Sequence, residues 1–409
     1  MSAFNKQTEL PETRARQWLT LVGRKRILVI VHTVAYGKRL LDVLSLFEAD
    51  FRVQVIFAAP PHAFGDEVPR FLERMGVVAL PWEEVTKMTF DLALAAGPQR
   101  VGDVQAPLIT IPHGANYLKR VLGVAGPNVA GLRRADLMPG GAPLPAAVVV
   151  PHHEDLDDLA GSCPEALDVA RVVGDPAHDR ILASLPRRDE YRQALGLSES
   201  QKLVVVTSTW GPQSSFGRLE TLVPRLIGEL PATRCRSAML VHPNVWSGHG
   251  AWQVQAWLAR CSQEGIGLVP PFTDWRSVLI CADWIIGDHG SVTLYGTLTG
   301  APILLASSPE QEINPASPAA RLARTAPALS PAHSLTDQLA YASAEYLPEE
   351  YAAIAARITS EPGRFNRNMR KVMYGLLNLG QPAHAPITPV LPSPPPLDSW
   401  TTGGQENSA

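Results

Sequence analysis

The sequence predicts an α/β protein built from two doubly wound, Rossmann-like domains, and three observations lead to this fold class. The chain has 409 residues and is 45% hydrophobic, which suffices for two domains with cores of their own. Short apolar runs alternate with helical stretches in both halves, as expected when helices cover both faces of parallel sheets. The halves also echo each other, because Asp-Leu-Ala-Leu-Ala-Ala from residue 91 is similar to Asp-Trp-Ile-Ile-Gly from residue 283.

The expected strands follow the apolar runs in chain order. Those of the first half are predicted at residues 27–31, 53–57, 77–80, 92–95, 108–111 and 147–150. Those of the second half are predicted at residues 203–207, 238–241, 267–269, 284–286 and 303–305. Helices between successive strands complete two doubly wound units.

The boundary between the domains is predicted at residues 151–171, where Pro-His-His-Glu-Asp-Leu-Asp-Asp interrupts the strand pattern before a new strand at Val172. We therefore expect a first domain of residues 24–160 and a second domain of residues 171–362. His152, His153 and Glu154 within the interruption are ligand types for a metal ion. Because neighbours in sequence do not define a coordination sphere, we interpret the segment as an acidic linker or helix start and expect no metal site.

The ends of the chain are expected to differ in structure. Residues 1–23 are predicted to form a helical segment, residues 363–380 a C-terminal helix and residues 381–409 a disordered tail. Seven prolines follow Gly380, and such a composition is unfit for a core. Basic residues at positions 14, 16, 24, 25 and 26 flank apolar residues around Trp18. They suit either a basic helix on a membrane surface or a solvated helix face.

Composition excludes several classes of function. The formal net charge of -3 gives no reason to expect a nucleic-acid partner. The four cysteines are far apart, which argues against a zinc site and a disulfide framework. The N-terminal residues lack the apolar core of a signal peptide, and no apolar run reaches the roughly 18 residues of a membrane span. We expect a cytoplasmic protein, with peripheral contact to the inner face of the membrane left open.

Residues 282–291, Ala-Asp-Trp-Ile-Ile-Gly-Asp-His-Gly-Ser, are the most informative segment of the chain. An apolar strand ends in a polar turn, and a helix begins. The unpaired N–H groups and the dipole of a helix start favour phosphate, and Ser291 is expected both to cap the helix and to offer its hydroxyl. A capped helix after a buried strand explains the pattern equally well. The first strand is followed by no Gly-x-Gly-x-x-Gly, and the chain contains no Walker-type loop, which disfavours a dehydrogenase and a P-loop hydrolase.

An ordered set of short motifs resembles one known family. The motifs are Pro112-His-Gly-Ala-Asn-Tyr-Leu-Lys119, Gly174-Asp-Pro-Ala-His-Asp179, Arg192-Gln-Ala-Leu-Gly-Leu197, residues 202–211, Val241-His-Pro-Asn244 and Asp288-His-Gly-Ser291. Over roughly residues 105–305 they are similar to the CDP-glycerol glycerophosphotransferases, the teichoic-acid primases and polymerases. The resemblance implies a glycosyltransferase B-like fold with the active site in an interdomain cleft.

The resemblance assigns a role to His113, and positions at strand ends and helix starts suggest roles for other residues. His113 occupies the position of the family's proposed catalytic base, and an imidazole at a strand end can accept a hydroxyl proton near neutral pH. Asp288 is expected to orient a donor hydroxyl or nearby backbone. The expected donor-binding residues are Ser208, Thr209, His242, His289, Gly290 and Ser291. The expected acceptor-side residues are His32, Gly114 and Lys119, with Lys38 and Arg39 also able to face the acceptor. Ordinary strand-end and capping roles explain many of these residues as well.

The sequence departs from the family at two motifs. Pro112 replaces a tryptophan before His113, and His289 and Gly290 stand where the family commonly has tyrosine and serine. These changes leave the donor open between CDP-glycerol and a nucleotide sugar. We expect a metal-independent transferase without a cofactor, acting on a hydroxyl acceptor that is either lipid-linked or soluble. A catalytically silent nucleotide-binding protein and a sugar-nucleotide epimerase remain alternatives, and a homo-oligomer stays open.

Overall fold

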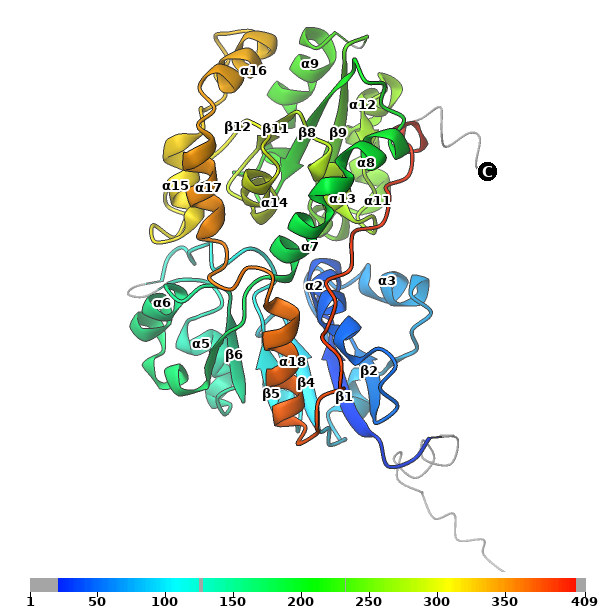
Figure 1. Cartoon of the computed structure of the whole chain (residues 1–409), viewed down its shortest axis with the longest axis vertical. Helices are drawn as coiled ribbons and strands as arrows, with labels where there is room; N and C mark the ends of the chain where they lie inside the picture. The colour runs from blue at the N-terminus through cyan, green and yellow to red at the C-terminus, as the bar shows by residue number, and fades with distance from the viewer. Residues whose placement is uncertain (1–20, 125–127, 232, 402–409) are drawn as a thin grey trace, which may run out of the picture.

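Two parallel sheets form the framework of the molecule (Figure 1). The computed structural model describes residues 21–124, 128–231 and 233–401. Within these residues the first sheet has seven strands in the order β3-β2-β1-β4-β5-β6-β7, and the second has five in the order β10-β9-β8-β11-β12. Neighbouring strands of each sheet run parallel. The predicted fold class is confirmed.

The strands coincide with the apolar runs of the sequence. The first sheet consists of β1 (Lys25–Ile30), β2 (Val53–Ala58), β3 (Ala79–Leu80), β4 (Leu92–Ala95), β5 (Leu108–Thr110), β6 (Ala147–Val150) and β7 (Ala170–Val172). The second consists of β8 (Lys202–Ser208), β9 (Cys235–Val241), β10 (Gly267–Leu268), β11 (Trp284–Gly287) and β12 (Ile303–Leu305). Every strand expected in the two halves is present, with ends shifted by at most a few residues.

Helices cover both faces of each sheet. The helices up to residue 229 are α2 (Val34–Leu44), α3 (Val68–Arg74), α4 (Trp82–Val85), α5 (Arg134–Leu137), α6 (Asp155–Ser162), α7 (Pro176–Ser184), α8 (Arg188–Ala194) and α9 (Leu219–Glu229). The later ones are α10 (Pro243–His249), α11 (Ala251–Trp257), α12 (Ala259–Gln263), α13 (Trp275–Ile280), α14 (Ser291–Tyr295), α15 (Pro318–Thr325), α16 (Leu335–Ala344), α17 (Pro348–Ala356) and α18 (Phe365–Leu376).

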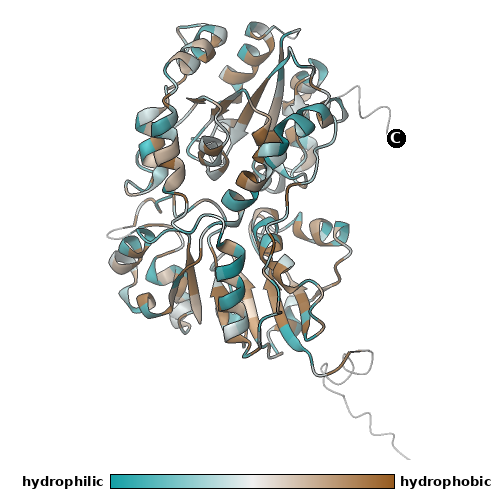
Figure 2. Ribbon diagram, in the orientation of Figure 1, coloured by the Kyte–Doolittle hydropathy of each residue, from teal (hydrophilic) through white to brown (hydrophobic). Residues whose placement is uncertain are grey.

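Hydropathy follows these layers. Figure 2 shows hydrophobic strands in the interior and mixed colouring on the helices outside. The apolar residues of β1 and β4 are fully buried, as are the central valines of β8. Burial of apolar surface on both faces of a sheet supplies most of the driving force for such a layered fold.

The domain boundary differs from the prediction in two respects. Strand β7 pairs with β6, with Val148 opposite Ala170, so the first sheet extends past residue 160. Near the C-terminus, α18 packs into the core of the first domain through Phe365, Met369 and Met373. Three-residue strands carry a weak sequence signal, and the return of a distant helix depends on long-range packing that local pattern does not encode. The first domain is therefore assembled from both ends of the chain.

The prediction of a disordered tail is wrong for residues 381–401. This segment runs back along the first domain beside α18 and then along the second domain (Figure 1), and three of its side chains are buried in the second domain's core: Leu391, Leu397 and Trp400. The Tyr191 hydroxyl donates to the Leu391 carbonyl at 2.8 Å. Proline favours an extended backbone that needs no internal hydrogen bonds, so the segment is ordered by the surface it crosses. Residues 402–409 lie outside the described part.

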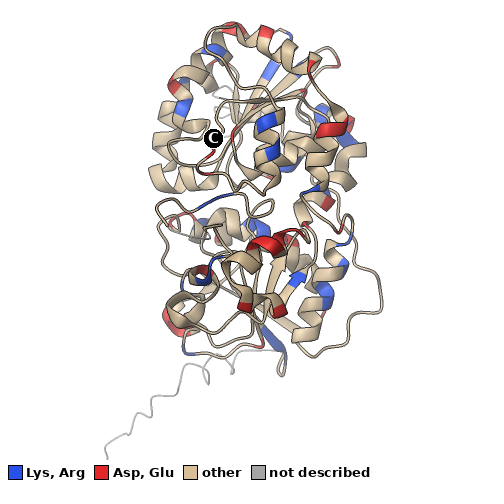
Figure 3. Ribbon diagram, turned by 90° about the vertical axis from the view of Figure 1, so that its left-hand side faces the viewer, with Lys and Arg blue, Asp and Glu red and all other residues tan. Residues whose placement is uncertain are grey.

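The N-terminal helical segment was predicted over residues that the structure largely leaves undescribed. Of the basic residues considered for a membrane-surface helix, Lys25 and Arg26 belong to β1, and Lys25 Nζ lies 2.9 Å from Asp91 Oδ1. Among the described residues, none of the helices combines the length and apolarity needed to cross a membrane. Figure 3 shows acidic and basic residues interspersed over both domains.

Candidate functional site

The two sheets bring their switch points to the boundary between the domains. The order of strands reverses between β1 and β4 in the first sheet and between β8 and β11 in the second. Ligands of doubly wound sheets bind at such points, outside the carboxyl ends of the strands. Most residues predicted for the site end or closely follow a strand at one of these edges, and the exceptions are Lys119 and, on α2, Lys38 and Arg39.

Asp288 organises the loops of the second domain. It is 1% exposed, and its carboxylate accepts backbone N–H bonds from Thr209, Ser215 and Gly290 at 2.8–2.9 Å. Burial raises the pKa of this carboxyl, while the N–H donors and Lys119 oppose the rise. The carboxylate thus fixes the turn after β8 against the turn after β11. Of the two roles expected for Asp288, the geometry favours orientation of nearby backbone.

Ser291 begins α14 but does not cap it, contrary to the sequence prediction. Gly290 is the N-cap residue and has no side chain with which to cap. The Ser291 hydroxyl instead faces Gly114 of the first domain, where an added Cβ atom would overlap it. Because α14 has five residues, few peptide dipoles add up at its start. At this edge, we therefore expect the Ser291 hydroxyl to contribute more to anion binding than the dipole of α14 does.

Lys119 was predicted on the acceptor side, but it lies against the second domain. Its Nζ donates to Thr209 Oγ1 at 3.0 Å and lies 5.5 Å from the centre of the Trp210 ring. The segment is held there by pairing across the domains, since Arg120 N donates to Glu312 O at 2.9 Å. Burial lowers the pKa of Lys119, and the charges of Asp288 and Glu312 oppose this. Lys119 places a positive charge beside the proposed phosphate site.

His113 follows β5 and lies on the side of the first domain that faces the second domain. Its ring packs against Tyr36, with the ring centroids 4.7 Å apart, yet the side chain remains accessible to solvent. Surrounding protein lowers its pKa from 6.5 to about 4, mainly by burial and then through the positive charges of Arg39 and Lys119. His113 is thus an accessible side chain in a largely protein-surrounded position between the domains. Its imidazole is neutral at pH 7 and can accept a proton.

His242 is oriented by its own helix. It is the N-cap residue of α10, and its Nδ1 accepts the backbone N–H of Asn244 at 3.1 Å. Burial lowers its pKa to about 3, helped by the charge of Lys119, so the ring is neutral. With Nδ1 acting as an acceptor, the ring proton resides on Nε2. His242 can therefore donate a hydrogen bond from Nε2 to an anion.

Two other predicted donor-binding side chains are engaged within the protein. His289 Nε2 lies 3.0 Å from Glu312 Oε2, and its side chain is buried. The Ser208 hydroxyl donates to the Thr209 carbonyl at 2.7 Å and accepts the backbone N–H of Phe216 at 2.8 Å. Both residues thus shape the loops, which is the ordinary structural role considered for Ser208 in the sequence.

The first-domain wall is lined by rings. His32 is fully buried, and its Nε2 lies 2.6 Å from the Gln99 carbonyl, so its predicted acceptor-side position is beneath the surface. Tyr36 and His62, which the sequence interpretation missed, lie with their ring centroids 5.9 and 6.0 Å from that of His32. His62 follows β2 at the same sheet edge as His32 and could have been found by that position. Tyr36 lies on α2 and gave no comparable signal.

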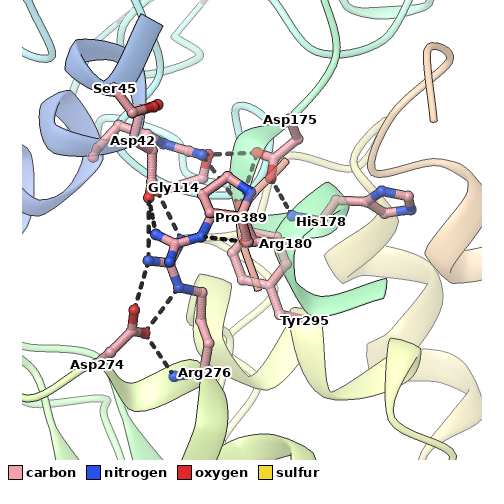
Figure 4. Close-up of polar contacts among 11 residues, drawn as sticks. Asp42, Ser45, Gly114, Asp175, His178, Arg180, Asp274, Arg276, Tyr295 and Pro389 are labelled. Carbon is pink, nitrogen blue, oxygen red and sulfur yellow. Dashed lines mark hydrogen bonds and ion pairs between the residues drawn. The ribbon is translucent and has the colours of Figure 1, made fainter. Parts of the chain in front are cut away.

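Helix α2 carries charged side chains into the second domain (Figure 4). Asp42 accepts hydrogen bonds from Arg180 and Arg276, each at 2.7 Å. Lys38 Nζ donates to the Pro271 carbonyl at 3.1 Å. Burial of these groups makes their pairing important for the placement of the domains, because an unpaired buried charge is costly.

His152, His153 and Glu154 lie together at the start of α6. Their potential ligand atoms are all within 4.8 Å of one another, close enough to share a metal ion. Glu154, however, accepts from Arg357 at 2.8 Å, and His152 Nδ1 accepts the backbone N–H of Glu154 at 3.1 Å. These contacts agree with a helix start, one of the two interpretations of this segment.

Solved structures similar to this chain include a wall teichoic acid polymerase, TagF. A histidine-to-asparagine variant of TagF soaked with CDPG is 11% identical, with a TM-score of 0.58 and coverage of 88% of this chain and 90% of that chain. A histidine-to-alanine variant is 12% identical, with a TM-score of 0.57 and coverage of 87% and 89%. The chain has the glycosyltransferase B fold. A complex of S. aureus MnaA with UDP is 14% identical, with a TM-score of 0.50 and coverage of 89% and 100%.

At these identities the likeness is one of fold. No protein-family model matches the chain, and no curated protein matches it in sequence. A shared fold does not specify a function, which depends on the residues of the site.

Proposed function

We propose that the chain is a metal-independent transferase, which moves a glycerol phosphate or glycosyl group from a nucleoside diphosphate donor to an acceptor hydroxyl. The observation that carries this proposal is the close approach of the His113–Gly114 turn to Ser291. A proton acceptor from one domain and a phosphate-binding edge from the other then share one space. The fold likeness to TagF soaked with CDPG and to MnaA with UDP supports a nucleotide as donor.

Three side chains bind the donor phosphates in this proposal. Lys119 supplies a positive charge beside Thr209, His242 donates from Nε2, and Ser291 donates its hydroxyl. Charge-assisted hydrogen bonds of this kind are stronger than neutral ones. They also stabilise the negative charge that develops on a leaving phosphate, so they favour the transition state over the bound donor.

The transfer step uses His113 as general base. The acceptor O–H proton passes to the neutral imidazole while the oxygen attacks the donor. With CDP-glycerol, a new O–P bond forms at the phosphorus of the glycerol phosphate, and CMP leaves with the electron pair of the broken P–O bond. With a nucleotide sugar, the new bond forms at the anomeric carbon, and the nucleoside diphosphate leaves.

In this proposal, donor binding also changes the pKa of His113. The positive charges of Arg39 and Lys119 lower the pKa of His113 and so weaken it as a proton acceptor. A diphosphate bound beside Lys119 offsets that charge and raises the pKa toward its ordinary value. The base thus becomes stronger once the donor is in place.

The test is binding and turnover by the full chain, with CDP-glycerol and UDP-sugars as donors and soluble polyols or a lipid-linked polyol as acceptors. We expect calorimetry to detect nucleoside diphosphate binding and expect nucleotide release only when an acceptor is present. Product formation without an acceptor would instead indicate an epimerase. Failure to bind either CDP or UDP would overturn the proposal.

A second candidate, a catalytically silent nucleotide-binding protein, is favoured by the low basicity of His113. Tight nucleotide binding without turnover of any of these donors, at a pH where His113 is neutral, would support this candidate over the transferase.

A further inference from the structure

Arg39 connects three parts of the molecule that meet at the proposed site. It lies on α2, is 6% exposed, and its guanidinium donates to the carbonyl oxygen of Gly114. The same Nη2 atom lies 2.8 Å from Asp175 Oδ2 and 3.1 Å from the Tyr295 hydroxyl. Figure 4 labels Gly114, Asp175 and Tyr295, the three partners of Arg39. One side chain therefore contacts the turn that carries His113, the chain crossing between the domains and helix α14.

The partners of Arg39 are themselves fixed. The Tyr295 hydroxyl donates to Asp175 Oδ2 at 2.8 Å, and Asp175 Oδ1 accepts the backbone N–H of His178 at 2.8 Å, which caps α7. Asp175 is fully buried. Burial alone would raise its pKa, but Arg39 and these hydrogen bonds hold the pKa below its usual value. The pair is a buried salt bridge in which Arg39 Nη2 makes all three contacts, while the buried Nη1 has no hydrogen-bond partner among the described residues. Breaking such a pair is costly, because it leaves an uncompensated buried charge.

The two ends of this network are the two halves of the proposed site. Gly114 is adjacent to His113, and its Cα faces the Ser291 hydroxyl so closely that a Cβ atom would not fit. Tyr295 is the last residue of the helix that Ser291 begins. Arg39 therefore contacts both partners of this close approach: the turn that contains Gly114, and helix α14, which begins with Ser291.

We propose that Arg39 is a positioning residue, which holds the His113 turn in register with α14 so that the base and the phosphate-binding edge reach the same donor. The proposal rests on the proposed transferase function. Arginine suits the task because its guanidinium is rigid and planar and stays charged when buried, so Nη2 keeps a fixed position, whereas lysine presents an ammonium on a flexible stem. A misplacement of about 1 Å at a reacting centre can cost a hundredfold in rate.

The first test is kinetic. We expect Arg39→Lys to lower kcat by about tenfold to a hundredfold while the KM for the donor changes less than threefold. The matched control is Arg192→Lys, which alters a largely buried arginine–aspartate pair, with Asp283, inside the second domain alone. Wild-type kcat in Arg39→Lys, or an equal loss of kcat in Arg192→Lys, would overturn the positioning role.

The second test measures His113 directly and needs no substrate. The charged and titratable groups that face His113 are Arg39 and Tyr36 on α2, Lys119 and His242. Removing one positive charge favours the imidazolium, so Arg39→Gln should raise the pKa of His113 in an NMR titration, and Arg39→Lys should leave it nearly unchanged. An unchanged pKa in Arg39→Gln would show that the guanidinium is not held beside the His113 turn.

If Arg39→Gln does not fold, the network is tested by the kinetics of Tyr295→Phe. This change removes one hydroxyl of the network and keeps the ring, so we expect kcat to fall about threefold to tenfold with donor affinity preserved. Full activity in Tyr295→Phe would contradict the coupling. A wild-type chain without any turnover would overturn the transferase function alone, because the His113 titration would still report whether Arg39 holds the turn.

Discussion

The two domains present different polar groups to the proposed site. On the second domain, Asp288 and Ser208 accept backbone N–H groups with their side-chain oxygens. His242 uses Nδ1 to accept a backbone N–H of its own helix, which leaves Nε2 available for a ligand. On the first domain, the rings of His113 and Tyr36 pack against each other. In the proposed transferase, the second domain therefore holds the donor phosphates, while the first supplies the base, His113.

The largest effect is expected from removal of the proposed base, His113. We expect His113→Ala to lower turnover by about a hundredfold to ten-thousandfold, the usual range for a lost acid-base group. Donor affinity should barely change, because in the proposed function the donor phosphates are bound by Lys119, His242 and Ser291 and not by His113. The control is His333→Ala, which removes an exposed imidazole outside the proposed site. Near-normal turnover in a folded His113→Ala protein would assign the base to another residue.

Removing the positive charge of Lys119 should affect binding instead. Lys119→Met keeps much of the side-chain volume and deletes the charge beside Thr209. We expect nucleoside diphosphate affinity to fall by about 1.5–3 kcal/mol, the usual size of a hydrogen bond to a charged group, with nucleoside affinity unchanged. Calorimetry on Lys119→Met and on the exposed Lys202→Met measures the difference. Equal weakening of nucleoside and nucleotide would mean that Lys119 acts on the fold.

The pH dependence of kcat/KM tests the role of His113 as the base. An ordinary histidine with a pKa near 6.5 would lose about thirtyfold of its neutral form between pH 8 and pH 5. The pKa of His113 is lowered to about 4, so its neutral form persists at pH 5 and declines only near pH 4. We therefore expect kcat/KM to stay nearly constant from pH 8 to pH 5. A histidine base with an ordinary pKa would instead make kcat/KM fall within this range. An acid limb near pH 6.5 would contradict the lowered pKa.

The smallest expected effect is at Ser291. Ser291→Ala removes one hydroxyl and should weaken nucleoside diphosphate binding by about 0.5–1.5 kcal/mol, the net value of one hydrogen bond. Nucleoside binding should not change, and Ser200→Ala, at an exposed position, serves as the comparison. A loss in Ser291→Ala that is equally large for nucleosides would move the phosphate contact elsewhere.

Sequence pattern predicted the framework well because buried parallel strands leave unbroken apolar runs, as at β1 and β8. It also brought His113, His242 and Asp288 to the carboxyl edges of the sheets. It placed Lys119 on the wrong side of the proposed site, because that residue is held by pairing with a loop of the second domain nearly two hundred residues away. The cap of α14 was misassigned because the residue that turns the chain there is a glycine.

The return of α18 to the first domain has a consequence for how the molecule folds. Met369 and Met373 complete a core that begins with Ile27 on the first strand. During synthesis, the first domain therefore has to wait for almost the whole chain before its core can close, and the second domain waits longer still for Leu397. Contacts of such sequence separation are slow to form. Folding on the ribosome should thus yield two nearly finished domains that become stable together, only after the last helix and the segment behind it emerge.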